Sequence, residues 1–169
     1  MNPISIIRQF IKGLLKDNEP YQIGLAVAFG LIIGVIPKNN ITAQLIFIIA
    51  VSTKANIPFL ILSIFFFSSF SLITDILTDK IGYFILTREF LNAFFTKMYN
   101  TPFIPWTDFN NTVVMGGVIV GIVVFFPVYL LGKKFGAYYK EKLANKISNL
   151  KFIKMLKASW LFEWYFNKD

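Results

Sequence analysis

Apolar runs alternate with short polar breaks along this sequence, and their lengths predict its architecture. The runs cover residues 21–36, 41–53, 59–77 and 113–131. At about 1.5 Å per helical residue, the first two span roughly 24 and 20 Å, whereas a hydrocarbon core is about 30 Å thick. The last two are long enough to cross that core. The pattern therefore predicts an all-α, polytopic membrane protein with two full transmembrane helices.

The two short runs are joined by a polar tip, Pro37-Lys38-Asn39-Asn40, and are expected to form a helical hairpin over residues 21–53. The hairpin is either re-entrant or a pair of tilted, broken helices. Irregular backbone is tolerated at membrane depth only where protein covers it or where it lines a water-filled cavity. We expect the hairpin to pack against the spans at residues 59–77 and 112–132.

Amphipathic segments flank this membrane domain, which we place at residues 21–132. In residues 1–20, apolar side chains recur at helical spacing opposite basic ones, which predicts a helix lying in the membrane interface or docked on the protein. Residues 133–169 are basic and carry an apolar stripe over residues 143–156. The pattern favours an interfacial helix on anionic lipid, with a solubilising cytoplasmic tail as the alternative.

Local signals predict where two helices begin. Asn56 precedes Pro58, and proline suits the first turn of a helix. Thr107 and Asp108 are residue types that cap the start of a helix, here the last span.

The composition excludes an ordinary soluble domain. Of 169 residues, 56% are hydrophobic and only 15% are charged, whereas soluble domains have about 45–50% apolar and about 25% charged residues. A chain this small could not bury so much apolar surface in water, because its surface-to-volume ratio is too high. Lipid as the solvent removes this difficulty.

The basic residues set the expected orientation. The net charge is +8, and lysines beside apolar spans favour anionic lipid headgroups over nucleic acid as the partner. Positively charged flanks stay on the cytoplasmic side, so both termini should lie in the cytoplasm and the spans in a bacterial inner membrane. An even number of crossings follows, which is two crossings plus a re-entrant hairpin, or four crossings.

The sequence carries no enzyme signature. It contains neither cysteine nor histidine, which excludes disulfides, thiolate or imidazole metal ligands and the usual nucleophile–base pairs. Asp75 and Asp79 lie one helical turn apart, but without a histidine they fit a helix end paired with Lys80 better than an acid–base couple. We therefore predict no catalytic residue, no metal site and no cofactor.

A candidate polar membrane site lies at the hairpin tip, where Lys38, Asn39, Asn40 and Gln44 are close in sequence. At membrane depth an ammonium costs at least about 2.5–3.5 kcal/mol and needs a partner or a function. Asp75 is the nearest acidic candidate. The alternative places Lys38 at the interface as a plain loop lysine, because a helix of roughly 24 Å nearly reaches the far side.

Small residues predict a close contact between helices. Ala26, Gly30 and Gly34 recur every four residues and share one helix face, which lets a second helix approach closely. We expect this face to pack against Gly117 and Gly121 of the same chain, with packing against another copy as the alternative.

The same residues carry a family resemblance. The succession Ala26-x-Ala28-x-Gly30-x-x-x-Gly34-x-x-Pro37, then the polar tip, a second apolar run and Asn56, resembles the bacterial membrane proteins catalogued as domain of unknown function 2062. The resemblance covers roughly residues 20–135 and implies a short multi-span protein with glycine-rich broken helices. Some members are fused to glycosyltransferases, and no activity is established for the family. This chain departs from the pattern where Phe67-Ser68-Ser69-Phe70 replaces an Asn-Pro pair, which puts any role of that pair in doubt here. The serine hydroxyls can instead bond carbonyls of their own helix.

Two functional classes remain. The first is a non-enzymatic protein that organises the membrane or envelope through anionic lipid or a partner protein. The second is a small transporter or channel with its site at the broken helices near Lys38–Gln44. An intramembrane enzyme ranks last, and a homo-oligomer is compatible with the first two. The side chains expected to contact the lipid surface are Lys133, Lys134, Lys151, Lys154, Lys157, Trp160 and Trp164.

Overall fold

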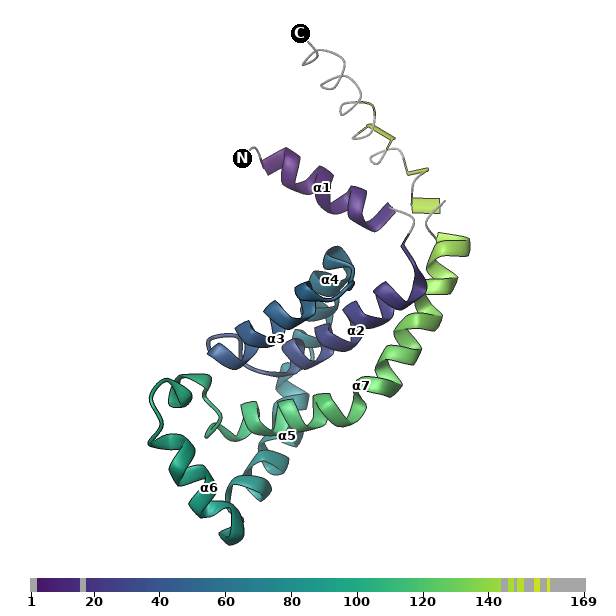
Figure 1. The fold of residues 1–169 in the computed structure, drawn as a ribbon. Helices are drawn as coiled ribbons and strands as arrows, with labels where there is room; N and C mark the ends of the chain where they lie inside the picture. The colour runs from purple at the N-terminus through teal and green to yellow at the C-terminus, as the bar shows by residue number, and fades with distance from the viewer. Residues whose placement is uncertain are drawn as a thin grey trace.

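The computed structural model describes residues 3–15, 18–143, 146–147, 149–150, 154–155 and 158, and its regular elements are helices (Figure 1). In chain order they are α1 (Pro3–Leu15), α2 (Pro20–Val35), α3 (Ile41–Ser52), α4 (Ile57–Ser68), α5 (Ser71–Leu86), α6 (Glu89–Tyr99), the 3₁₀ turn η1 (Ile104–Thr107), α7 (Thr112–Tyr138) and the π-helical turn η2 (Tyr139–Leu143). No residue within these described ranges forms a β-strand. The all-α prediction is confirmed.

Helix α2 is the centre of the bundle and packs against both α4 and α7 (Figure 1). It runs antiparallel to α7, because Gly24 near its start lies against Tyr129 and Lys133, whereas Ile32 near its end lies against Gly121. It runs parallel to α4, because Gly30 lies against Ser63 and Gly34 against Phe67. Helix α3 connects the end of α2 to the start of α4 and runs in the opposite direction. A helix covered on two sides has no polar face, which explains why α2 is apolar all round.

Three helices begin at an asparagine whose side chain accepts a backbone N–H of the first turn. Asn40 accepts from Ala43, Asn56 from Phe59, and Asn111 from Val113 and Val114. These bonds satisfy donors that every helix start leaves without a partner. The expected helix start at Asn56 is confirmed. The expected caps of the last span, Thr107 and Asp108, are wrong, because η1 ends there and α7 begins after Asn111.

The predicted span at residues 59–77 does not form one straight helix. It is divided between α4 and α5, which meet at an angle of 80°. The hydroxyls of Ser68 and Ser69 donate to carbonyls one turn back, as expected, and such bonds bend helices. Ser68 also donates to the Gly34 carbonyl at 3.3 Å, which holds this elbow against the end of α2.

Helix α1 docks through its last turn where α4 begins and α7 ends. The Gly13 carbonyl accepts the side-chain amide of Asn56 at 3.1 Å. The Tyr139 hydroxyl donates to the Leu14 carbonyl at 3.2 Å. Two isoleucines in the first half of α1 remain exposed. The C-terminal end of this helix is therefore docked on the protein. Its N-terminal half remains available for contact with a membrane interface.

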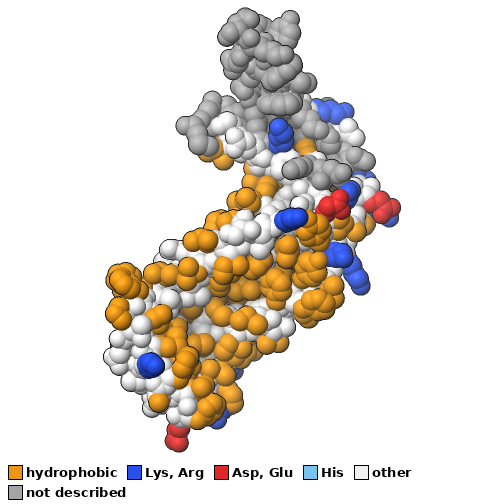
Figure 2. All heavy atoms as spheres, viewed as in Figure 1, with side chains coloured by type: hydrophobic (Ala, Val, Ile, Leu, Met, Phe, Trp, Pro, Cys, Tyr) orange, Lys and Arg blue, Asp and Glu red, His pale blue; other side chains and the backbone are white. Residues whose placement is uncertain are grey.

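Large apolar side chains lie on the outside of this fold, and many small ones lie inside. Glycine and alanine account for most of the buried positions of α2 and α7. The surface that we call the apolar belt consists of residues more than half exposed on α3, α4, α5 and α7: Ile48, Ile49, Phe65, Phe66, Leu72, Ile73, Ile76, Ile122, Val123, Phe126 and Leu131. Figure 2 shows apolar side chains across one face of the molecule, with charged side chains gathered towards its two ends.

One described helix, Thr112–Leu143, is long and apolar enough to cross a membrane, and the bent α4–α5 pair is a second if it forms one span. Only 22% of the apolar window in the first is buried, whereas the core helix of a soluble protein is mostly covered. This favours association with a membrane. Helix α7 continues past residue 132 to Tyr138, so the first residues of the basic tail are part of this helix.

Candidate functional site

The hairpin tip holds Lys38 at the C-terminal end of α2. Its ammonium donates to the Gly34 carbonyl at 2.7 Å, one of the carbonyls that lack a partner at a helix end. A cation at this end also interacts favourably with the helix dipole. Because the same carbonyl accepts the Ser68 hydroxyl, Lys38 caps α2 at the point where the α4–α5 elbow touches it.

Asp75, the expected partner of Lys38, acts on this lysine from α5. The carboxylate favours the charged ammonium, while partial burial disfavours it. Burial is the larger effect and lowers the pKa of Lys38. Asp75 and Lys38 therefore lie close enough to interact electrostatically. The ammonium of Lys38 donates its hydrogen bond to α2 and not to the carboxylate.

The remaining predicted tip residues have separate surroundings. Asn40 is buried, accepts the Ala43 N–H and donates to the Pro37 carbonyl at 2.7 Å. Asn39 and Gln44 are exposed. Asn40 thus shapes the turn and caps α3, and its burial follows from that structural task.

The tip lies beside the segment that precedes α7. Ile36 packs on Gly117 in the second turn of α7. The Thr42 hydroxyl donates to the Thr107 carbonyl in η1 at 2.6 Å. Since η1 comes before α7 begins, the tip reaches the end of the bundle opposite Lys133.

The small-residue face of α2 packs against α4. A Cβ added to Gly30 would collide with Ser63, and one added to Gly34 would collide with Phe67. Ala26, on the same face, is fully buried. The contact lies within one chain, as expected, but the expected partner helix is wrong.

Gly117 and Gly121 of α7 instead receive large side chains from another face of α2 and from the residue that follows it. Ile32 packs on Gly121 and Ile36 on Gly117. Residues two positions apart point about 200° apart around a helix, so Gly30 and Ile32 face opposite neighbours. The spacing of small residues identifies both faces but does not say which face meets which.

Replacing Gly30 by leucine should lower the melting temperature of the protein in detergent. The side chain would enter a contact between α2 and the backbone of α4, and overpacking of this kind costs about 1–3 kcal/mol or more. The control is Ala93→Leu, at an exposed position of α6, which should melt like the parent protein. A Gly30→Leu protein that is as stable as the parent would show that the α2–α4 contact is not close-packed.

Basic residues gather where α7 leaves the bundle. Lys133 and Lys134 are exposed, and so is Lys54 in the nearby connection between α3 and α4. Lys140 pairs with Glu19 at 3.5 Å across the helix ends. Of the other predicted lipid-contact residues Lys154 is exposed, while Lys151, Lys157, Trp160 and Trp164 lie outside the described residues.

The first part of the predicted tail stripe contacts the protein. Leu143 and Ile147 pack against the buried cluster that contains Tyr139. The first two residues of the predicted stripe therefore face the protein and not lipid.

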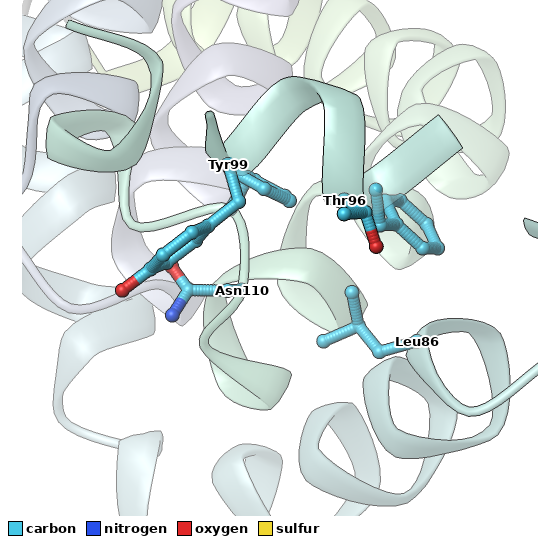
Figure 3. A pocket seen from close by; sticks show the side chains of 6 residues that line it. Leu86, Thr96, Tyr99 and Asn110 are labelled. Atoms are coloured by element: carbon cyan, nitrogen blue, oxygen red, sulfur yellow. The ribbon is translucent and has the colours of Figure 1, made fainter. Parts of the chain in front are cut away.

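A pocket beneath α6 was not identified from the sequence. Its volume is about 290 Å³, and it is lined by Leu86, Phe95, Thr96, Tyr99, Phe109 and Asn110 (Figure 3). The rings of Phe95 and Phe109 stack with centroids 6.1 Å apart. The sequence contained one indication of this pocket, the apolar residues on one face of residues 89–99. It did not indicate which other segment would pack against that face.

Comparison with protein families assigns the chain. The model of an uncharacterized protein conserved in bacteria, DUF2062, matches residues 6–144. The chain belongs to this family. An uncharacterized protein of Treponema pallidum (strain Nichols) is 24% identical to this DUF2062 protein over 144 residues, which cover 85% of the chain and 89% of the relative. No solved structure matches this chain.

The DUF2062 match contains the whole helical bundle. It begins in α1 and ends just after η2. The resemblance seen over residues 20–135 is confirmed and extends further at both ends. Residues 145–169 lie beyond the match, so the family model covers only residues 133–144 of the basic tail.

Proposed function

We propose that this DUF2062 protein is a multi-pass protein of the bacterial inner membrane whose bundle is surrounded by lipid. The apolar belt carries the proposal, because its large side chains are more than half exposed on four helices. Soluble monomers rarely expose contiguous apolar patches larger than a few hundred Å². In lipid, helices associate through close packing of small residues, and glycines at the α2–α4 and α2–α7 contacts fit that rule.

The orientation that best accounts for the charges has four crossings, by α2, α3, α4 and α7. The tip near Lys38 then lies at the outer face, and Lys133 and Lys134 lie on the cytoplasmic side together with both termini. Helices α2, α3 and α4 have 16, 12 and 12 residues, fewer than the roughly 20 that span a typical core. We expect the bilayer to thin around them.

A non-enzymatic, membrane-organising role is the activity that we propose within this orientation. The exposed lysines at the cytoplasmic end support contact with anionic headgroups, at about 1 kcal/mol for each lysine near the surface. Lys38 and Asn40 have structural partners, which account for polar residues at the tip without a transported solute. This is why we rank the organising role above transport.

Replacing Lys133 and Lys134 by glutamine should weaken the preference of the purified protein for phosphatidylglycerol over phosphatidylethanolamine. Two lysines at about 1 kcal/mol each correspond to a change of up to roughly thirtyfold. Quantitative mass spectrometry of the lipids retained by the protein measures this ratio.

The matched control neutralises Lys80 and Lys97, which are exposed on α5 and α6 and lie towards the other end in the proposed orientation. It should retain the parental lipid ratio. Equal ratios in all three proteins would refute the contact with anionic lipid at the cytoplasmic end.

A further inference from the structure

We infer that the pocket beneath α6 holds a segment of one acyl chain of a membrane phospholipid, with the ester end of that segment at the mouth. The inference rests on the proposed insertion in a membrane and adds a defined lipid site to it. The pocket lies between the end of α5, helix α6 and the two residues that precede Asn111.

The lining suits a hydrocarbon chain with a polar end. Leu86, Phe95 and Phe109 provide a carbon-rich floor, and none of the lining residues is charged. Exposed Tyr99 and Asn110 lie on one side of the opening, with Thr96 and Leu86 across from them (Figure 3). A hydroxyl and an amide at the mouth can bond ester carbonyls, whereas a phosphate would find no cation in the lining.

The volume admits a segment of one chain and no more. At about 290 Å³, the pocket is just below the roughly 300–1,000 Å³ typical of ligand pockets. Water against its stacked phenylalanine rings is unfavourable. A chain from the adjoining leaflet removes that contact and gains dispersion contacts with the rings.

The backbone beside the pocket is strained, which is a second and independent observation. Phe103 and Asp108, on either side of η1, have φ values of 67° and 61°, in the left-handed region that residues other than glycine rarely adopt. Such strain persists where the surrounding structure holds it and clusters at binding sites. Here the turn at Asp108 brings the next residue, Phe109, to 7% exposure against Phe95.

The surroundings of the pocket are those of a membrane interface. Phe94 and Trp106 are more than half exposed nearby, and Trp106 forms an edge-to-face pair with Phe103 at 5.2 Å. Exposed aromatic side chains, tryptophan above all, are typical of the level at which lipid ester groups lie.

The test uses a phospholipid that carries a photoreactive diazirine in one acyl chain, in vesicles of phosphatidylethanolamine and phosphatidylglycerol that contain the full-length protein. Peptide mapping by mass spectrometry should find adducts enriched on Phe95, Tyr99 and Phe109 relative to the apolar belt. Thr96→Trp fills the pocket from its rim and should reduce these adducts by about tenfold, equivalent to about 1.4 kcal/mol of binding free energy.

Two further variants make the result decisive. Asn110→Trp fills the pocket from the opposite rim and should cause the same loss, while Ala93→Trp, on an exposed part of α6 outside the lining, should leave the adducts unchanged. Pocket adducts that persist in both filled variants overturn the inference, as does labelling by a photoreactive free fatty acid with none by the phospholipid. Adducts on the belt without enrichment in the pocket overturn the lipid site alone, whereas a belt without adducts overturns the membrane insertion as well.

Discussion

A cysteine in place of Asn39 should react with a membrane-impermeant maleimide added to intact cells. The chain contains no cysteine of its own, so all labelling reports that position. We expect exposure on the outer face because the Thr42 hydroxyl bonds the Thr107 carbonyl, which places the tip beside the segment preceding α7 and away from Lys133. Labelling is close to all or none, which makes this effect the largest that we predict.

Two control cysteines define the outcome. Thr101→Cys, at an exposed position after α6, should be labelled like Asn39→Cys. Lys54→Cys, in the connection between α3 and α4, should be labelled only after the cytoplasmic side is opened. If Asn39→Cys is protected while Thr101→Cys reacts, the hairpin is re-entrant, its tip lies below the surface, and transport becomes the better hypothesis.

Leucine in place of Gly116 should prevent the stable packing of α5 on α7. A Cβ on Gly116 would overlap the Thr78 carbonyl, and a Cβ on Gly82 would overlap the Thr112 carbonyl. Both obstacles are backbone atoms, which cannot rotate away as a side chain can. We therefore expect a loss above the usual 1–3 kcal/mol of overpacking, about 4 kcal/mol or more, out of a total stability of about 5–15 kcal/mol.

Thermal unfolding in detergent, with the yield of monodisperse protein, measures this loss. The matched control is Ala137→Leu, which adds a large side chain at an exposed position of the same helix and should leave the melting temperature unchanged. A Gly116→Leu protein with the parental melting temperature would contradict the close approach of α5 and α7.

The sequence predicted most helices because apolar runs and helix breakers are local signals. The helices at residues 21–36 and 41–53 and the start at Asn56 agree with the structure within one or two residues. The elbow after Ser68 was not predicted. Serines that bond their own carbonyls are compatible with a straight or a bent helix, and the Gly34 carbonyl that engages Ser68 lies far away in sequence.

Pairing between helices was harder to predict than the helices themselves. The glycine stripes on α2 and α7 marked close contacts correctly, but two stripes of equal spacing do not specify their partners. Only the structure shows that Gly30 meets Ser63 and that Gly121 meets Ile32. The pocket beneath α6 was missed for a related reason, since Phe109 reaches it through the left-handed backbone at Asp108. Aspartate adopts this conformation more readily than most residues, but its presence does not specify it.

The contact between the two ends of the bundle constrains how the protein is made. The Tyr139 hydroxyl and the Leu14 carbonyl that it bonds are 125 positions apart, and α2 receives its α7 partner only after nearly all of the bundle has been synthesised. Until then α2 can pack only on α3, α4 and α5, and Gly24 and the side chains of Ile32 and Ile36 remain uncovered. In the membrane topology that we propose, assembly therefore has two stages, in which α2, α3 and α4 associate first and α7 closes the bundle once it has been synthesised.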